Sequence, residues 1–144
     1  MSEVPPSGVD SRVLVLDTNI VLDLYVYEDT GTAPLREALA DSQTDWLATA
    51  PMREELARVL NYPQIGKRLV SRGLSGEAVL TLFDARACLV VAAPKAAYTC
   101  KDPDDQKFVD LAVAHRATLL SKDAEVLCMA RRLARLGVTV ARGM

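Results

Sequence analysis

Four acidic residues lie where an expected strand ends or an expected helix begins. They are Asp17, Glu55, Asp105 and Asp123. If the fold brings them together they form a negative cluster, because two carboxylates about 4 Å apart repel by roughly 4 kcal/mol at an effective dielectric near 20. Protons or cations must neutralise such a cluster. These four acids therefore indicate a cation site.

Carboxylate oxygens are hard ligands that suit Mg²⁺ or Mn²⁺, ions that usually keep waters and take substrate phosphates as further ligands. The chemistry that such a site predicts is metal-assisted attack on a phosphodiester. Helix capping is the simpler interpretation of each acid taken singly, since an Asp after a strand often accepts the free N–H groups of the next helix. Capping with Pro103 at the first helical position explains the segment DPDD, residues 102–105, equally well.

Helical phase separates one pair of neighbouring acids but not the other. In the expected helix of residues 51–60, Glu55 flanks the apolar stripe whereas Glu54 lies on the opposite, solvated side. We therefore expect Glu55 to face a crevice. Asp104 and Asp105 both flank the apolar stripe of their helix, so phase leaves the choice between them open.

The elements that must position these acids alternate along the chain. Short apolar runs predict strands over residues 12–16, 46–49, 89–91, 118–121 and 138–141. Helical patterns cover residues 20–27, 33–40, 51–60, 65–69, 75–88, 102–115 and 124–136. This alternation predicts an α/β sandwich with a mainly parallel sheet, in which ligands bind beyond the carboxyl ends of the strands.

Composition is that of an ordinary soluble protein. With 144 residues, 50% hydrophobic and 25% charged, we expect a single domain over residues 12–144 after a loose lead-in of residues 1–11. No apolar run approaches the roughly 20 residues of a membrane helix. The three cysteines lack paired spacing, which indicates reduced thiols in a cytoplasmic protein. A net charge of −2 excludes a global basic field for nucleic acid, so local basic residues or metal ions must hold any such ligand.

Three blocks of sequence resemble the PIN-domain ribonucleases, and in particular the toxin components of bacterial toxin–antitoxin pairs. The blocks are LVLDTNIV, MREELARVL and KDPDDQKFVDLAVAHRATLLSKDAEVL, and the resemblance extends from residue 13 to about residue 140. It implies a three-layer α/β/α sandwich with a central, mainly parallel sheet. It also implies Mg²⁺- or Mn²⁺-dependent RNA cleavage by an activated water, a protein antitoxin and a homodimer.

The resemblance assigns the family's acids to positions of this chain. They map, in chain order, onto Asp17, Glu55, Asp105 and Asp123. As implied roles, Asp17 and Asp105 are primary metal ligands and Asp123 binds the metal directly or through water. Glu55 holds a second metal or orients the attacking water.

Three further residues carry open assignments. Asn19 and Ser121 are supporting candidates that bind a metal water, a carboxylate or a phosphate oxygen, or else make local turn bonds. Glu125 occupies a position where the family more usually has Asp, which leaves its part in the site open.

Basic residues surround these acids in the sequence. They are Arg53, Arg58, Lys101, Lys107 and Lys122. They could draw RNA phosphates toward a negative cleft, but we expect most of them to be solvated surface charges.

Other functions fit the sequence less well. A PIN-like module that has lost turnover and binds RNA or a partner remains the main alternative. A phosphatase with an Asp nucleophile generally needs a second acid two residues later, where this chain has Asn19. A dinucleotide-binding Rossmann protein is disfavoured because the turn after the first strand has no G-x-G-x-x-G.

Overall fold

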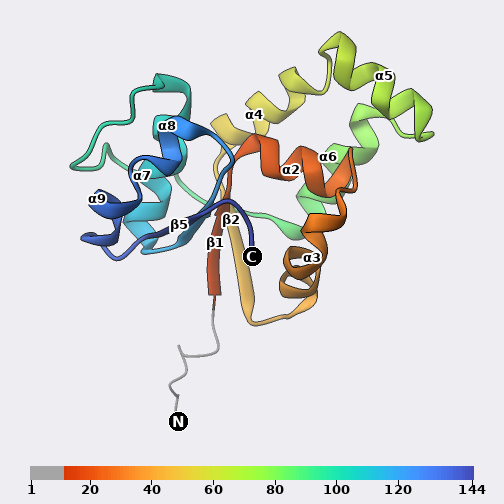
Figure 1. The fold of residues 1–144 in the computed structure, drawn as a ribbon. Coiled ribbons are helices and arrows are strands. Elements are labelled where there is room, and N and C mark those ends of the chain that lie inside the picture. The colour runs from red at the N-terminus through yellow and green to blue at the C-terminus, as the bar shows by residue number, and fades with distance from the viewer. Residues whose placement is uncertain (1–11) are drawn as a thin grey trace.

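Five parallel strands form the central sheet of the computed structural model (Figure 1). The strands are β1 (Arg12–Leu16), β2 (Thr44–Ala48), β3 (Cys88–Leu89), β4 (Thr118–Leu120) and β5 (Thr139–Ala141), in the spatial order β3-β2-β1-β4-β5. The structure describes residues 12–144, and the expected lead-in of residues 1–11 lies outside them.

Strand β1 is the centre of the sheet because its residues are apolar on both faces. Leu14 and Val15 are almost fully buried, and Leu14 is in register with Trp46 of β2 on one side and Thr118 of β4 on the other. Parallel strands covered on both faces read as continuous apolar runs, and RVLVL is such a run. The expected bounds of this strand, residues 12–16, are confirmed.

Helices cover both faces of the sheet. They are α2 (Thr18–Tyr25), α3 (Ala33–Ala40), α4 (Ala50–Val59), α5 (Pro63–Ser71), α6 (Gly76–Arg86), α7 (Gln106–His115), α8 (Ala124–Leu127) and α9 (Ala130–Ala134), with 3-10 turns η1 (Thr30–Thr32) and η2 (Pro103–Asp105). Figure 1 shows α7, α8 and α9 on one side of the strands and α2 and α3 on the other, with α5 farthest from the sheet. The predicted three-layer α/β/α sandwich is confirmed.

Two expected helices are divided in the structure. The expected helix of residues 124–136 is two short helices, because the Met129 N–H bonds the Val126 carbonyl, three residues back, and tightens the chain between them. The expected helix of residues 102–115 begins with the 3-10 turn η2, where Asp102 caps the Asp104 N–H at 3.0 Å. Across residues 12–144, no helix combines the length and the apolar character needed to cross a bilayer.

The strand order places a topological switch between β1 and β4. From β1 the chain passes through α2 and α3 to β2, whereas α7, on the opposite face, leads into β4. Ligands of open α/β sheets bind in the crevice beyond the carboxyl ends of the strands at such a point. The residues that follow β1 and β4 therefore lie where a ligand of this fold would bind.

Candidate metal centre

Asp17 directly follows β1 at the carboxyl edge of the sheet, and hydrogen bonds join it to β4 and the loop that follows β4. Its N–H continues the β1–β4 ladder to the Leu120 carbonyl at 2.9 Å. The residue is only 3% exposed, and its Oδ2 accepts the Ser121 hydroxyl at 2.6 Å. In the described part of the chain the Asp17 side chain does not cap α2, although it stands at the capping position. Capping therefore does not explain why this buried position carries an acid.

Ser121 links Asp17 to Asp123 in the loop after β4. The Ser121 side chain is fully buried, and its Oγ, which donates to Asp17, also accepts the Asp123 N–H at 3.0 Å. Asp123 is half-buried and caps α8, since its Oδ1 accepts the Glu125 N–H at 2.8 Å. One hydroxyl thus positions two acids, and capping accounts for one Asp123 oxygen.

Asp105 is the acid of η2 that enters the cluster. Asp104 is exposed, whereas Asp105 is 6% exposed and lies at the start of α7. Among the residues that the structure describes, its Oδ2 is buried and has no hydrogen-bond partner. An unpaired buried carboxylate oxygen is costly, so its position favours a bound cation or proton.

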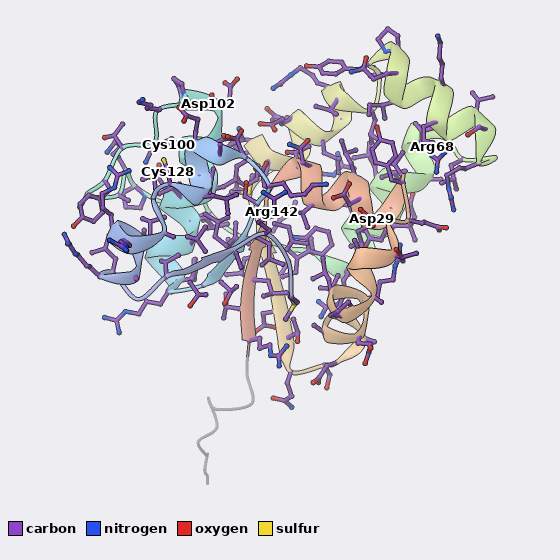
Figure 2. All side chains as sticks on the ribbon, viewed as in Figure 1. Asp29, Arg68, Cys100, Asp102, Cys128 and Arg142 are labelled. Carbon is purple, nitrogen blue, oxygen red and sulfur yellow. The ribbon has the colours of Figure 1, made fainter. Side chains whose placement is uncertain are left out.

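Asp102 joins this cluster, which the sequence interpretation missed. Carboxylate oxygens of Asp102, Asp105 and Asp123 all lie within 4.8 Å of one another. Figure 2 shows Asp102 at the same end of the molecule as Cys100, on the segment that leads into α7. The turn that carries its cap returns the Asp105 N–H to the Asp102 carbonyl at 3.0 Å. The sequence carries a signal for Asp102, since an Asp three residues before a candidate ligand shares its turn, but helix capping explains the same residue.

Burial and mutual repulsion disfavour the charged forms of the central acids. Burial raises the pKa of Asp105 to about 8, aided by the charge of Asp17 and by the contact with Asp123. Burial also raises the pKa of Asp17, against which the Ser121 hydrogen bond acts, and the charges of Glu55 and Asp123 raise it further. When all of its acids are ionised, the cluster carries more negative charge than its surroundings stabilise, and either retained protons or a divalent cation would relieve it.

Glu55 approaches the cluster from α4. Its neighbour Glu54 is exposed, as the helical phase indicates, whereas the Glu55 carboxylate turns inward. Glu55 Oε2 accepts the Thr18 hydroxyl at 2.7 Å, and Oε1 forms an ion pair with Lys107. Unlike Asp105, Glu55 already has a partner on both oxygens.

Asn19 and Glu125, two of the other candidates from the sequence, make different contacts from those of the acids. Asn19 is exposed on α2 and lines a cavity of about 490 Å³ with Tyr27, Tyr62 and Lys122 among others. Glu125 contributes backbone groups, because its N–H bonds Asp123 and its carbonyl accepts the Cys100 thiol at 3.5 Å. Of the supporting candidates, Ser121 is the one that the structure brings to the acids.

Comparisons with known proteins agree with this architecture. A family model described as "PIN domain" matches residues 13–124. No curated protein sequence matches the chain. A similar solved structure is that of VapBC2 from Rickettsia felis bound to a DNA fragment from their promoter. The TM-score is 0.60 and the identity 14%, over 89% of this chain and 96% of that chain. At this identity the likeness is one of fold.

Proposed function

Since the chain belongs to the PIN-domain family, we propose that it is a Mg²⁺- or Mn²⁺-dependent endoribonuclease that hydrolyses RNA phosphodiester bonds. The observation that carries the proposal is the buried Oδ2 of Asp105, which has no partner among residues 12–144 and lies among the carboxylates beyond β1 and β4. A site with this donor set suits a hard divalent cation. The resemblance of the sequence blocks to PIN-domain toxins supports RNA as the substrate.

We assign the following roles at the site. Asp17, Asp105 and Asp123 hold the cation, and Asp102 lies close enough to Asp105 and Asp123 to contribute. A bound divalent ion supplies Lewis-acid polarisation of the phosphate and lowers the pKa of a bound water. Ser121 keeps the Asp17 carboxylate directed into the crevice through its hydrogen bond.

The biological setting that we propose is a toxin restrained by a protein antitoxin in the cytoplasm, with the chain acting as a homodimer. The motif blocks that resemble toxin components support this setting, and so does the similarity of fold to a chain of VapBC2. The antitoxin would be a separate protein that covers or fills the acidic edge.

Cleavage of total RNA by the purified protein tests the proposed activity. We expect cleavage with Mg²⁺ or Mn²⁺, no cleavage with EDTA, and a loss of at least about 100-fold in Asp105→Asn, since charge stabilisation at the reacting group is usually a large term. Asp104→Asn is the matched control, because Asp104 is the exposed neighbour in the same turn. Cleavage that persists in EDTA or in Asp105→Asn contradicts the proposal. RNA binding without cleavage would favour the turnover-deficient binding module.

A further inference from the structure

Three contacts position the Lys107 ammonium next to Glu55. It lies in the first turn of α7, two residues after Asp105, and its ammonium forms an ion pair with Glu55. The same ammonium donates to the Asp104 carbonyl at 2.5 Å and lies 5.0 Å from the centre of the Phe108 ring. The Lys107 side chain is 25% exposed and that of Glu55 17%. Lys107 is therefore not the solvated charge that we expected of most basic residues here.

The two sides of the site differ in whether their carboxylate oxygens have partners. On the Glu55 side, Thr18 occupies one carboxylate oxygen and Lys107 the other. On the other side, within the described residues, Asp105 Oδ2 has no partner, although the carboxylates of Asp102 and Asp123 are close. The need for an added cation is thus concentrated away from Glu55.

A divalent ion beside Glu55 would have to replace existing bonds. It would displace the Lys107 ammonium, or stand close to it and be repelled, since like charges in partly buried surroundings repel by several kcal/mol at about 4 Å. It would also compete with the Thr18 hydroxyl for the same carboxylate. Metal ions in two-metal sites are roughly 3.5–4 Å apart, a spacing that leaves little room for an ammonium between them.

We propose that the Lys107 ammonium takes the place of a second metal ion, so that the site binds one divalent cation, on the Asp102–Asp105–Asp123 side. Glu55 is then a positioning residue that holds Lys107 and Thr18, and not a metal ligand. The inference rests on the proposed function in so far as the site binds a divalent cation. It goes further by assigning the number of ions and the part of Lys107.

Counting bound Mn²⁺ tests this inference without RNA or activity. The full-length protein is first freed of metal with EDTA and dialysed, and bound Mn²⁺ is then counted by electron paramagnetic resonance of the free ion and by calorimetry. We expect one bound ion in the wild-type protein and none in Asp105→Asn. In Glu55→Gln we expect one ion with an affinity within about threefold of wild type, since a carboxylate whose two oxygens are already bonded to Thr18 and Lys107 adds little attraction for the ion.

Substitutions of Lys107 provide the sharpest comparison. Lys107→Met removes the ammonium and leaves Glu55 Oε1 without its ion-pair partner, so the count should rise from one ion to two. Lys107→Arg keeps a cation and should stay at one, as should the control Lys101→Met, because Lys101 is an exposed lysine of the same segment. Loss of the second ion in Lys107→Met combined with Glu55→Gln would place that ion on Glu55. Circular dichroism checks that each variant is folded.

Each outcome separates the inference from the proposed function. Two ions in the wild-type protein, one ion in folded Lys107→Met, or loss of the ion in Glu55→Gln overturns the inference and leaves a metal-dependent nuclease possible. If Lys107→Met does not fold, the wild-type count and Glu55→Gln still decide. No Mn²⁺ binding, or binding unchanged in Asp105→Asn, contradicts the metal site on which the proposed function depends.

Discussion

At the scale of single residues, Ser121 shows how one buried hydroxyl organises charge. It donates to Asp17 and accepts from the Asp123 backbone, and its side chain is inaccessible to solvent. A carboxylate that accepts a hydrogen bond has its charged form favoured, which opposes the effect of burial on Asp17. Ser121 thus makes an ionised Asp17 tolerable next to other acids.

Replacing Ser121 by alanine should therefore weaken both the fold and the site. We expect Ser121→Ala to lower the free energy of unfolding by about 1–3 kcal/mol, since the buried Asp17 Oδ2 and the part-buried Asp123 N–H both lose their partner. RNA cleavage should fall by about 10-fold or more, as it does when a residue that orients a ligand is lost.

Urea denaturation and cleavage rates measure the two effects. Ser42→Ala is the control, because Ser42 is exposed and remote from these acids in the sequence. If Ser121→Ala matched that control in both measurements, the hydroxyl would have no organising part.

At the scale of elements, strand ends and helix starts place the acids. Asp17 ends β1, Asp123 follows β4, and Asp105 precedes α7. The opposite ends of α7 and α9 are shaped by backbone conformation, with Arg116 at φ 50° and Gly137 at φ 84°. These turns are remote along their elements from the acids, so fold stability can be altered there without touching the site.

Two glycine substitutions should change stability in opposite directions. Gly137→Ala should destabilise by about 1–2 kcal/mol, because the position needs a left-handed backbone and the new Cβ would lie 3.3 Å from Arg116 Cδ. Gly66→Ala should stabilise by about 0.5–1 kcal/mol, since Gly66 lies inside α5 and a Cβ there meets no atom of the described residues within 4 Å.

Thermal and urea unfolding of the two variants provide the measurement. Binding of Mn²⁺ should be unchanged in both at a temperature where they are folded. Equal effects of the same sign on stability would show that the backbone at Gly137 is not strained by a side chain.

At the scale of the whole molecule, the acid cluster joins segments far apart in the chain. Asp17 and Ser121 are 104 residues apart in sequence, and Asp105 meets Asp123 across the carboxyl edge of the sheet. Ionising the cluster therefore acts on the stability of the folded chain as a whole. The pKa of Asp105 is raised from 3.8 to about 8, and that of Asp17 is raised in the same direction.

Ionisation of Asp105 and Asp17 should consequently lower the free energy of unfolding of the metal-free protein as pH rises from about 4 to about 8. In that window the folded state binds more protons at Asp105 than the unfolded state does, so the slope of unfolding free energy against pH is negative. Asp105→Asn should flatten the slope. Added Mn²⁺ should raise the free energy of unfolding of the wild-type protein most strongly near pH 8, where the carboxylates are ionised and can bind the ion.

Denaturant unfolding in EDTA across this pH range, with and without Mn²⁺, is the measurement. Asp104→Asn should keep the wild-type slope. If Asp105→Asn kept it as well, the pKa of Asp105 would be ordinary and the cluster would not strain the fold.

The sequence by itself determined the order of the elements and the parallel sheet. It also indicated Asp105 and Asp123, two of the three acids whose carboxylates lie within 4.8 Å of one another. Hydrophobic period and capping signals act over a few residues, so they could be read without the fold. The bounds of residues 12–16 and 33–40 agree with β1 and α3, whereas the division of α8 from α9 depends on a tightened turn that periodicity does not report.

Only the tertiary structure decided how the acids are shared. The sequence resemblance already favours Asp105 over Asp104, and the structure agrees, with Asp105 buried and Asp104 exposed. The structure alone adds Asp102 to the cluster and gives Glu55 an ion pair with Lys107. These outcomes depend on distances of a few ångströms between segments separated along the chain, and Coulomb energy and desolvation follow those distances and not sequence spacing. For that reason the residue types indicated a cation site, whereas the packing of α4 and α7 against the sheet edge determined which carboxylate oxygens have a hydrogen-bond or ion-pair partner.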